Sequence, residues 1–260
     1  MATLHVSTFG PPDGRPVLAL HGVTAHSGRW RVLADALPEL RLSAADLRGH
    51  GHSPWLPPWH LEQHVADALE VLDELGPDPV VVFGHSFGGA VAVHLARAAR
   101  DRVAKLVLLD PAIGLDPADM LAAAEQTRAD ESYPDRAAAW ADRAARWPGI
   151  PDELVDAELE AHLMPDGQRW RYRYCQSTVV SAWSEMARPA LTPPSDLDTL
   201  LLPAARADYV RPEWVEACRD ELGARLQVTE IDAGHIVYLE RTGEVAERIR
   251  AFLRSPAPGP

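Results

Sequence analysis

The sequence predicts an α/β fold in which a mainly parallel sheet is flanked by helices and interrupted by an inserted helical segment. Three observations lead to this prediction. Short apolar runs alternate with helical patterns, the alternation stops between about Ile113 and Pro194, and one serine lies among small residues between a strand pattern and a helix pattern. Strands that alternate with helices are typical of βαβ units, and these place neighbouring strands in parallel.

Seven apolar runs are the strand candidates. Several of them are almost entirely apolar, as expected for strands that are covered on both faces. The runs span residues 4–9, 16–22, 40–46, 80–84, 104–110, 199–205 and 226–232. Periodic apolar positions predict the intervening helices at 29–37, 61–75, 88–100, 212–222 and 242–254.

The segment that breaks the alternation is rich in Ala, Glu, Arg and Trp. Its Pro and Gly residues divide it into three or four predicted helices, at 117–130, 134–147, 151–163 and 169–186. It is too long for a loop within a compact domain. We therefore expect a core formed by residues 1–112 and 195–260, with a helical cap, or lid, inserted at 113–194.

Composition limits the classes of function. The net charge of −13 over 260 residues argues against nucleic-acid and anionic-membrane partners. The sequence has no secretory signal pattern and no apolar stretch long enough to span a bilayer. Cys175 and Cys218 lack metal-site spacing, and the pair His60 and His64 lacks an accompanying carboxylate pattern. We expect a soluble cytoplasmic monomer or homodimer that needs no metal or cofactor.

The serine among small residues forms the pattern G-x-S-x-G, from Gly84 to Gly88, directly after a strand run and directly before a helix pattern. In a tight strand-to-helix turn, side chains two positions before and two positions after the serine would collide, so glycine is required at both. The helix that follows points its free N–H groups and its positive dipole end towards Ser86. The pattern predicts an exposed nucleophilic hydroxyl.

With this turn, the sequence resembles the α/β-hydrolase superfamily over nearly the whole chain. The segments "LALHGVTAHSGRW", "DLRGHGHS", "AARADYV" and "DAGHIVYLE" are similar to family segments in the expected order; they span 18–30, 46–53, 204–210 and 232–240. The resemblance implies a serine hydrolase of the esterase or lipase type, with a helical cap and with nucleophile, acid and histidine following one another along the chain.

The partners of Ser86 follow from this order. His235 is the only histidine in the last third of the chain and is expected to be the general base. Asp208, after the strand run 199–205, is the expected acid because similar proteins have theirs at this place. Asp110 is the competing candidate, since some members take the acid from the preceding strand, and Asp232 is a third aspartate near the histidine.

The resemblance and the turn geometry also predict an oxyanion hole. Its two donors would be the backbone N–H groups of Val23, which follows His21-Gly22, and of Phe87, which follows the nucleophile. Residues expected to line the substrate pocket are His21, Trp140, Trp147, Trp183 and Ile236. The alternative for the tryptophans of the insertion is that they form the core of the cap itself.

These features predict cleavage of small to medium apolar carboxylic esters through an acyl-enzyme intermediate. Lactone, thioester and carbon–carbon bond cleavage would use the same residues and stay open. A serine in place of an aspartate argues against epoxide hydrolases and haloalkane dehalogenases. A ligand-binding protein of hydrolase fold with an idle triad is the non-enzyme alternative.

Overall fold

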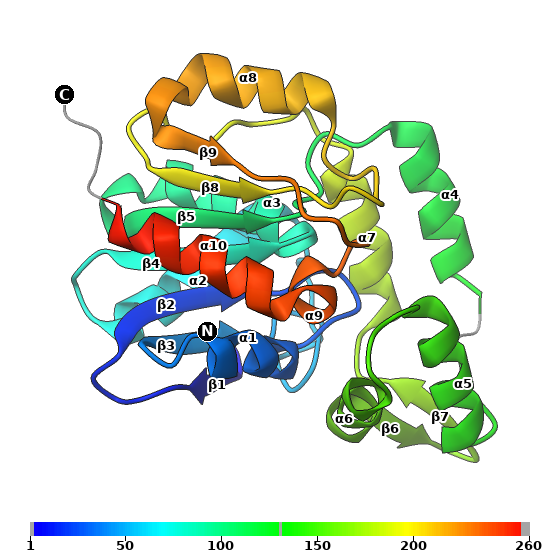
Figure 1. Ribbon diagram of the computed structural model, residues 1–260. Helices are drawn as coiled ribbons and strands as arrows, with labels where there is room; N and C mark the ends of the chain where they lie inside the picture. The colour runs from blue at the N-terminus through cyan, green and yellow to red at the C-terminus, as the bar shows by residue number, and fades with distance from the viewer. Residues whose placement is uncertain (1–2, 130–131, 256–260) are drawn as a thin grey trace.

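The computed structural model describes residues 3–129 and 132–255. Within these residues the main sheet has seven strands in the order β1-β3-β2-β4-β5-β8-β9, and only β1 runs antiparallel to its neighbour (Figure 1). The strands are β1 Val6–Phe9, β2 Arg15–Leu20, β3 Leu40–Ala45, β4 Val80–His85, β5 Val103–Leu109, β8 Thr199–Leu202 and β9 Leu226–Val228. Each lies within or overlaps an apolar run that predicted it, and the expected fold class is confirmed.

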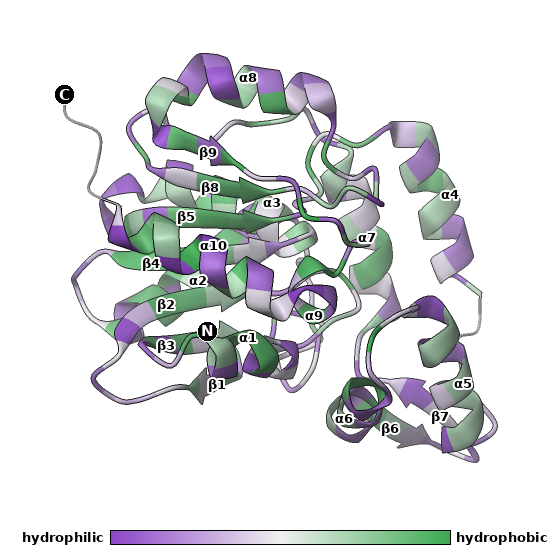
Figure 2. Ribbon diagram, viewed as in Figure 1, coloured by the Kyte–Doolittle hydropathy of each residue, from purple (hydrophilic) through white to green (hydrophobic). Residues whose placement is uncertain are grey.

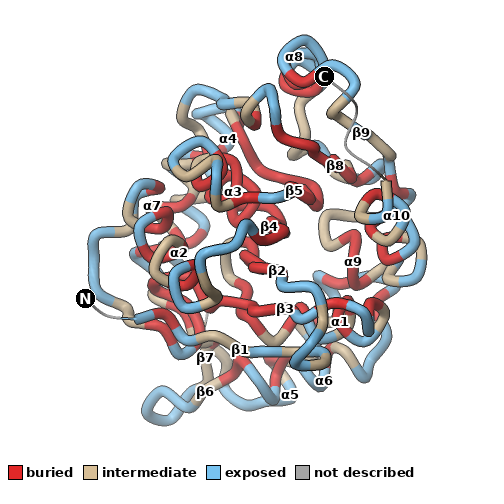
Figure 3. Tube along the Cα trace, turned by 90° about the vertical axis from the view of Figure 1, so that its left-hand side faces the viewer, coloured by how far each residue is buried: buried red, intermediate tan, exposed pale blue. Residues whose placement is uncertain are grey.

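The sheet is buried on both faces by two separate apolar layers. Along β4, Val80 and Val82 belong to one buried cluster whereas Val81 and Phe83 belong to the other, as the twofold repeat of a strand requires. Figure 2 shows the hydrophobic strands between amphipathic helices, and Figure 3 shows the central strands β2, β4, β5 and β8 as mostly buried. One layer contains residues of α2 Leu61–Leu75, α3 Phe87–Ala98 and α8 Pro212–Leu222, the other residues of α1 Arg31–Ala36, α9 Val237–Glu240 and α10 Thr242–Arg254.

Three short 3-10 helices, η1 Ser27–Trp30, η2 Arg100–Arg102 and η3 Gly223–Arg225, complete the core outside the insertion. Lys105, the only lysine of the sequence, lies on β5 and is buried. Its ammonium group donates to the carbonyls of Phe252 and Ser255, at 3.0 and 2.8 Å, at the end of α10. A cation at this position stabilises the negative end of the helix dipole and holds the last helix against the sheet.

The insertion between β5 and β8 contains a hairpin as well as helices. Its elements are α4 Pro117–Thr127, α5 Arg136–Arg146, α6 Asp152–His162, β6 Leu163–Asp166, β7 Arg169–Tyr172 and α7 Gln176–Met186. The single helix expected over 169–186 is therefore wrong in its first part. The run Arg-Trp-Arg-Tyr alternates with period two, and Gly167, with φ 60°, lies in the two-residue turn that pairs β7 with β6.

Backbone hydrogen bonds attach the insertion to the core. The N–H of Gly51 donates to the carbonyl of Arg173 at 2.8 Å, and the N–H of Cys175 donates to the carbonyl of Gly49 at 2.7 Å. A Cβ on Gly49, whose φ is 83°, would lie 2.0 Å from Oγ1 of Thr178 at the start of α7. This close approach fixes the insertion beside the carboxyl ends of the parallel strands (Figure 1).

Candidate active site

Ser86 lies in a sharp turn between β4 and α3. Its φ and ψ are 53° and −122°, a region that residues other than glycine rarely adopt. A Cβ on Gly84 would lie 2.5 Å from the carbonyl oxygen of Gly88, and one on Gly88 would lie 2.2 Å from that of Leu20. Gly84 is thus required for the expected reason, a collision across the turn, whereas Gly88 is required because the end of β2 approaches it closely.

Backbone strain concentrates at one edge of the sheet. Among residues 3–129 and 132–255, the non-glycine residues with positive φ are Thr24, Ser86 and Asp110. They follow β2, β4 and β5, which are adjacent and parallel, so their carboxyl ends meet at the same edge. Strained residues persist where the surrounding structure imposes them, and they cluster at functional sites. The edge that contains Ser86 is therefore the candidate active site.

Three side chains meet at this edge in a continuous line of hydrogen bonds. Nε2 of His235 lies 2.9 Å from Oγ of Ser86, and Nδ1 of His235 lies 2.6 Å from Oδ2 of Asp110. Asp110 is fully buried, and its second oxygen accepts from the backbone N–H of Ala204 at 3.0 Å. An Nδ1–H that donates to the carboxylate leaves Nε2 free to accept the proton of the serine hydroxyl.

The structure contradicts the expectation that Asp208 is the partner of the histidine. Asp208 is exposed in the loop after β8, and its neighbour Tyr209 stacks on the ring of His235 with centroids 4.0 Å apart. Asp110 follows β5 directly and has a φ of 41°. Its carboxylate lies within hydrogen-bond distance of His235. Asp232 is exposed and pairs with Arg206 instead. The competing candidate from the sequence, Asp110, thus occupies the position.

His85, inside the serine turn, supports the histidine loop. Its Nε2 lies 2.9 Å from the carbonyl oxygen of His235, and the two rings are 4.8 Å apart. Burial lowers the pKa of His85 well below its ordinary value, so this ring is neutral and donates its Nε2 proton. On the other side of the loop, the N–H of Gly234 donates to Glu240 at 2.9 Å. His235 is consequently held from both sides.

The turn from Gly22 to Ala25 lies directly against the serine. A Cβ on Gly22 would be 2.8 Å from Cβ of Ser86, and the N–H of Ala25 donates to the carbonyl of Gly22 at 3.2 Å. Val23 lies in this turn, which we call the oxyanion turn. Phe87 is the first residue of α3, where a backbone N–H has no partner within the helix. These N–H groups remain the candidate oxyanion donors.

His21 holds the oxyanion turn in place and does not line a pocket. It is fully buried, its Nδ1 lies 2.7 Å from the carbonyl oxygen of Gly22, and its Nε2 accepts from the N–H of Leu47 at 2.9 Å. Burial lowers the pKa of His21 to about 3. Both ring nitrogens are occupied by backbone groups, so the expectation of substrate contact is wrong for this residue.

The expected pocket tryptophans differ in position. Trp140 on α5 donates to Asp156 on α6 at 2.8 Å, and the guanidinium groups of Arg29 and Arg143 both lie over the ring of Trp147. Trp140 thus packs within the insertion, which was the alternative for it, whereas Trp147 packs where the insertion meets the core, in the same buried cluster as core strands.

The other two expected pocket residues are Trp183 and Ile236. Trp183 on α7 donates to Oγ1 of Thr127 at 2.9 Å, and it packs against both apolar layers of the core. Ile236 follows His235 directly and is partly buried. Val23 likewise contacts both layers. An apolar lining from Trp183 and Ile236 remains a prediction, and Val23 is a further candidate for it.

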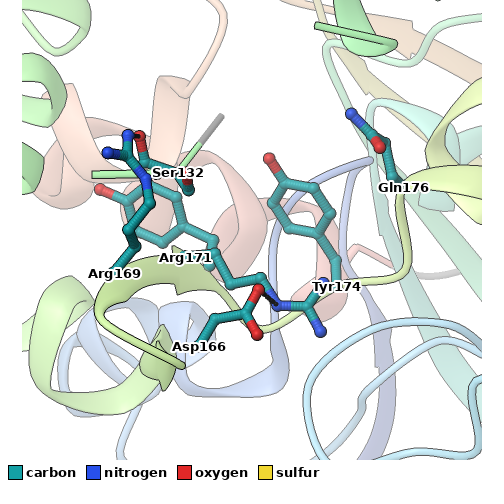
Figure 4. A pocket seen from close by; sticks show the side chains of 7 residues that line it. Ser132, Asp166, Arg169, Arg171, Tyr174 and Gln176 are labelled. Atoms are coloured by element: carbon teal, nitrogen blue, oxygen red, sulfur yellow. Dashed lines mark hydrogen bonds and ion pairs between the residues drawn. The ribbon is translucent and has the colours of Figure 1, made fainter. Parts of the chain in front are cut away.

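A hollow of about 370 Å³ lies on the insertion (Figure 4). It is polar, and its arginines are engaged: Arg169 donates to the backbone carbonyl of Ser132 at 2.7 Å, and Nε of Arg171 lies 3.3 Å from Asp166. No residue of the Ser86, His235 and Asp110 line borders this hollow. We therefore assign it no part in the site.

The described residues offer neither a metal centre nor a membrane-spanning helix. Within 3–129 and 132–255 there is no group of three or more His, Cys, Asp or Glu side chains suited to hold a metal ion. In the same ranges, every helix is too short or too polar to cross a bilayer. Of the histidine pair considered from the sequence, His60 is exposed, whereas His64 is fully buried.

The buried histidines predict marked sensitivity to acid. Burial lowers the pKa of His21, His50 and His64 to about 3 each, whereas an unfolded histidine has a pKa of about 6.5. Between these values the unfolded chain binds more protons, so the free energy of unfolding falls as the pH falls. Each group contributes about 1.4 kcal/mol per pH unit, or roughly 4 kcal/mol for the three.

Domains typically have a free energy of unfolding of about 5–15 kcal/mol. At this slope, most of that free energy would be lost when the pH falls one to three units below about 6. Urea unfolding followed by fluorescence at pH values between about 7.5 and 4.5 measures this loss. We expect the midpoint to fall steeply below about pH 6. A midpoint that stays constant down to about pH 5 would show that these rings titrate normally.

The fold and the serine turn define the class of this protein as an α/β hydrolase. A solved structure, that of E-2-(acetamidomethylene)succinate hydrolase, superposes with a TM-score of 0.82 at 22% identity, covering 97% of this chain and 95% of that one. The chain belongs to the alpha/beta hydrolase family, whose model matches residues 17–248.

Two relatives match over almost their full lengths. Lipase LipV of Mycobacterium tuberculosis is 43% identical over 96% of this chain and 97% of its own. Esterase YbfF of Escherichia coli is 26% identical over 93% of this chain and 94% of its own. The matched portions include the serine turn and the C-terminal histidine segment, so the similarity spans both ends of the candidate site.

Proposed function

We propose that this protein is a carboxylic ester hydrolase that cleaves apolar esters of small to medium size through an acyl-enzyme intermediate on Ser86. The observation that supports this most strongly is the unbroken line from Oγ of Ser86 through His235 to the buried carboxylate of Asp110. An idle binding protein would have no need of a strained serine aligned with a base. The lipase and esterase names of the two relatives agree with this class.

In the acylation step, Oγ of Ser86 attacks the ester carbonyl carbon while Nε2 of His235 accepts the hydroxyl proton. Asp110 holds the imidazole tautomer and stabilises the imidazolium that forms. The carbonyl oxygen becomes an oxyanion and accepts hydrogen bonds from the N–H groups of Val23 and Phe87. His235 then gives its proton to the departing alkoxide, which leaves as the alcohol.

Deacylation repeats these steps with water as the nucleophile. His235 removes a proton from water, the hydroxide attacks the acyl carbon, and the second oxyanion occupies the same donors. When this intermediate collapses, Ser86 regains its proton from His235 and the carboxylic acid is released. An apolar lining from Trp183, Ile236 and Val23 would favour apolar acyl groups over charged ones.

A substrate panel tests the proposal. We expect p-nitrophenyl esters from acetate to laurate to be turned over, with an optimum at short to medium chains, at rates at least about 10³-fold above a Ser86→Ala background. A γ-lactone, an acyl-CoA and a C–C cleavage substrate in the same panel distinguish the reactions that share these residues. A protein that binds the esters but hydrolyses none of them above the background would overturn the assignment.

A further inference from the structure

Glu158, on α6 of the insertion, is a buried carboxylate that binds side chains of the core. Its side chain is 1% exposed; its oxygens lie 2.5 and 2.9 Å from Nη2 and Nε of Arg29, and 3.0 Å from Nε2 of His26. A second arginine also approaches this carboxylate: Nη2 of Arg143 lies 3.9 Å from Oε1 of Glu158. Burial opposes the ionisation of Glu158, but the charge of Arg29 and the hydrogen bonds from Arg29 and His26 outweigh it and hold the pKa of Glu158 well below the ordinary value. The carboxylate is therefore charged.

The two core residues bound by Glu158 lie just after the oxyanion turn. His26 follows Ala25, the last residue of the turn, and its Nδ1 accepts from the N–H of Gly28 at 3.1 Å. Nη2 of Arg29 lies 3.4 Å from the carbonyl oxygen of Thr24. Thr24 has a φ of 60°, a conformation that costs free energy for a β-branched residue and needs support from its surroundings.

We propose that Arg29 and Glu158 are positioning residues that hold the oxyanion turn, so that the insertion takes part in building the oxyanion hole. The inference rests on the proposed ester hydrolysis. Arg29 binds the carbonyl of Thr24, the residue after Val23, and Glu158 fixes the guanidinium by two charge-assisted hydrogen bonds. Hydrogen-bond donors for an oxyanion act only when they are placed in advance, and an error of about 1 Å can cost about 10²-fold in rate.

The second arginine of the cluster provides a matched control. Arg29 and Arg143 both stack on Trp147, with their guanidinium carbons 5.0 and 5.1 Å from the ring centroid, and both approach Glu158. Nε of Arg143, however, donates to Oη of Tyr172 at 3.1 Å within the insertion. Removing either guanidinium disturbs the same buried cluster, but only Arg29 contacts the oxyanion turn.

The experiment compares Arg29→Met with Arg143→Met in full-length protein. For Arg29→Met we expect kcat for a p-nitrophenyl ester to fall about 10- to 100-fold with KM changed less than about threefold. Inhibition by an alkylboronic acid, whose adduct with serine places an oxygen where the oxyanion forms, should weaken by a similar factor. For Arg143→Met, kcat and boronate affinity should stay within about threefold of wild type.

Urea unfolding of both variants separates the catalytic effect from stability. Equal losses of kcat in the two variants, or a loss in Arg29→Met confined to KM, would show that the cluster only anchors the insertion. If Arg29→Met does not fold, Glu158→Gln applies the same test: it keeps the shape of the side chain but removes the charge that fixes Arg29. A Glu158→Gln protein with wild-type kcat overturns the inference. An inactive wild-type protein would overturn the proposed function instead.

Discussion

Ser86→Ala is expected to lower kcat for an activated ester by about 10⁴- to 10⁶-fold. The change removes the oxygen that lies 2.9 Å from Nε2 of His235. Alanine adds no atoms to the crowded turn, and the glycines that permit its geometry are unchanged. The loss should therefore appear in kcat and in acyl-enzyme formation, with little change in the free energy of unfolding.

The control for this substitution is Ser184→Ala, an exposed serine on α7. Initial rates with p-nitrophenyl butyrate and a urea unfolding curve measure both effects in the same preparations. Ser184→Ala should match wild type in kcat and in unfolding midpoint. A Ser86→Ala protein that keeps more than about a hundredth of the wild-type kcat would mean that the hydroxyl is not the nucleophile.

The second large effect concerns the acid. Asp110→Asn should lower kcat about 10³- to 10⁴-fold, because an amide cannot hold the histidine in the tautomer that leaves Nε2 free to accept a proton. The carboxylate of Asp110 is fully buried, lies 2.6 Å from Nδ1 of His235 and accepts from the N–H of Ala204. Asn has nearly the same shape as Asp, so the fall in kcat should be larger than a change in packing could cause.

Asp208→Asn makes the same chemical change at an exposed position, and its kcat should stay within about twofold of wild type. Comparing kcat for the two variants at a pH where the wild-type rate is constant decides between the two aspartates. The reverse order, with Asp208→Asn inactive and Asp110→Asn active, would restore the assignment made from the sequence and would mean that the loop after β8 rearranges.

Much of the fold follows from local pattern. The seven strands lie within or overlap the apolar runs because a sheet covered on both faces tolerates few polar residues. Ser86 could be identified because the turn requires glycine at fixed spacing, and His235 because few histidines occur late in the chain. The hairpin β6–β7 was missed because its aromatic and arginine residues occur equally well in helices, whereas their twofold alternation was the signal for a strand.

The acid could not be decided from the sequence, because β5 and β8 are adjacent and both are followed by an aspartate. Which carboxylate reaches the histidine depends on the backbone angles at the strand ends. One signal pointed to Asp110: it follows an apolar run directly, whereas Asp208 lies several residues beyond β8. Glu158 was also missed, since nothing in the pattern of α6 distinguishes a buried carboxylate from the exposed ones around it.

Labelling with an alkylphosphonate p-nitrophenyl ester, followed by peptide mass spectrometry, tests most directly whether strain at the end of β4 presents a reactive oxygen to His235. We expect one equivalent of p-nitrophenol to be released as activity is lost, and a single adduct on Ser86 that is absent from Ser86→Ala. An adduct on another residue, or full inactivation without modification of Ser86, would contradict the site described for this fold.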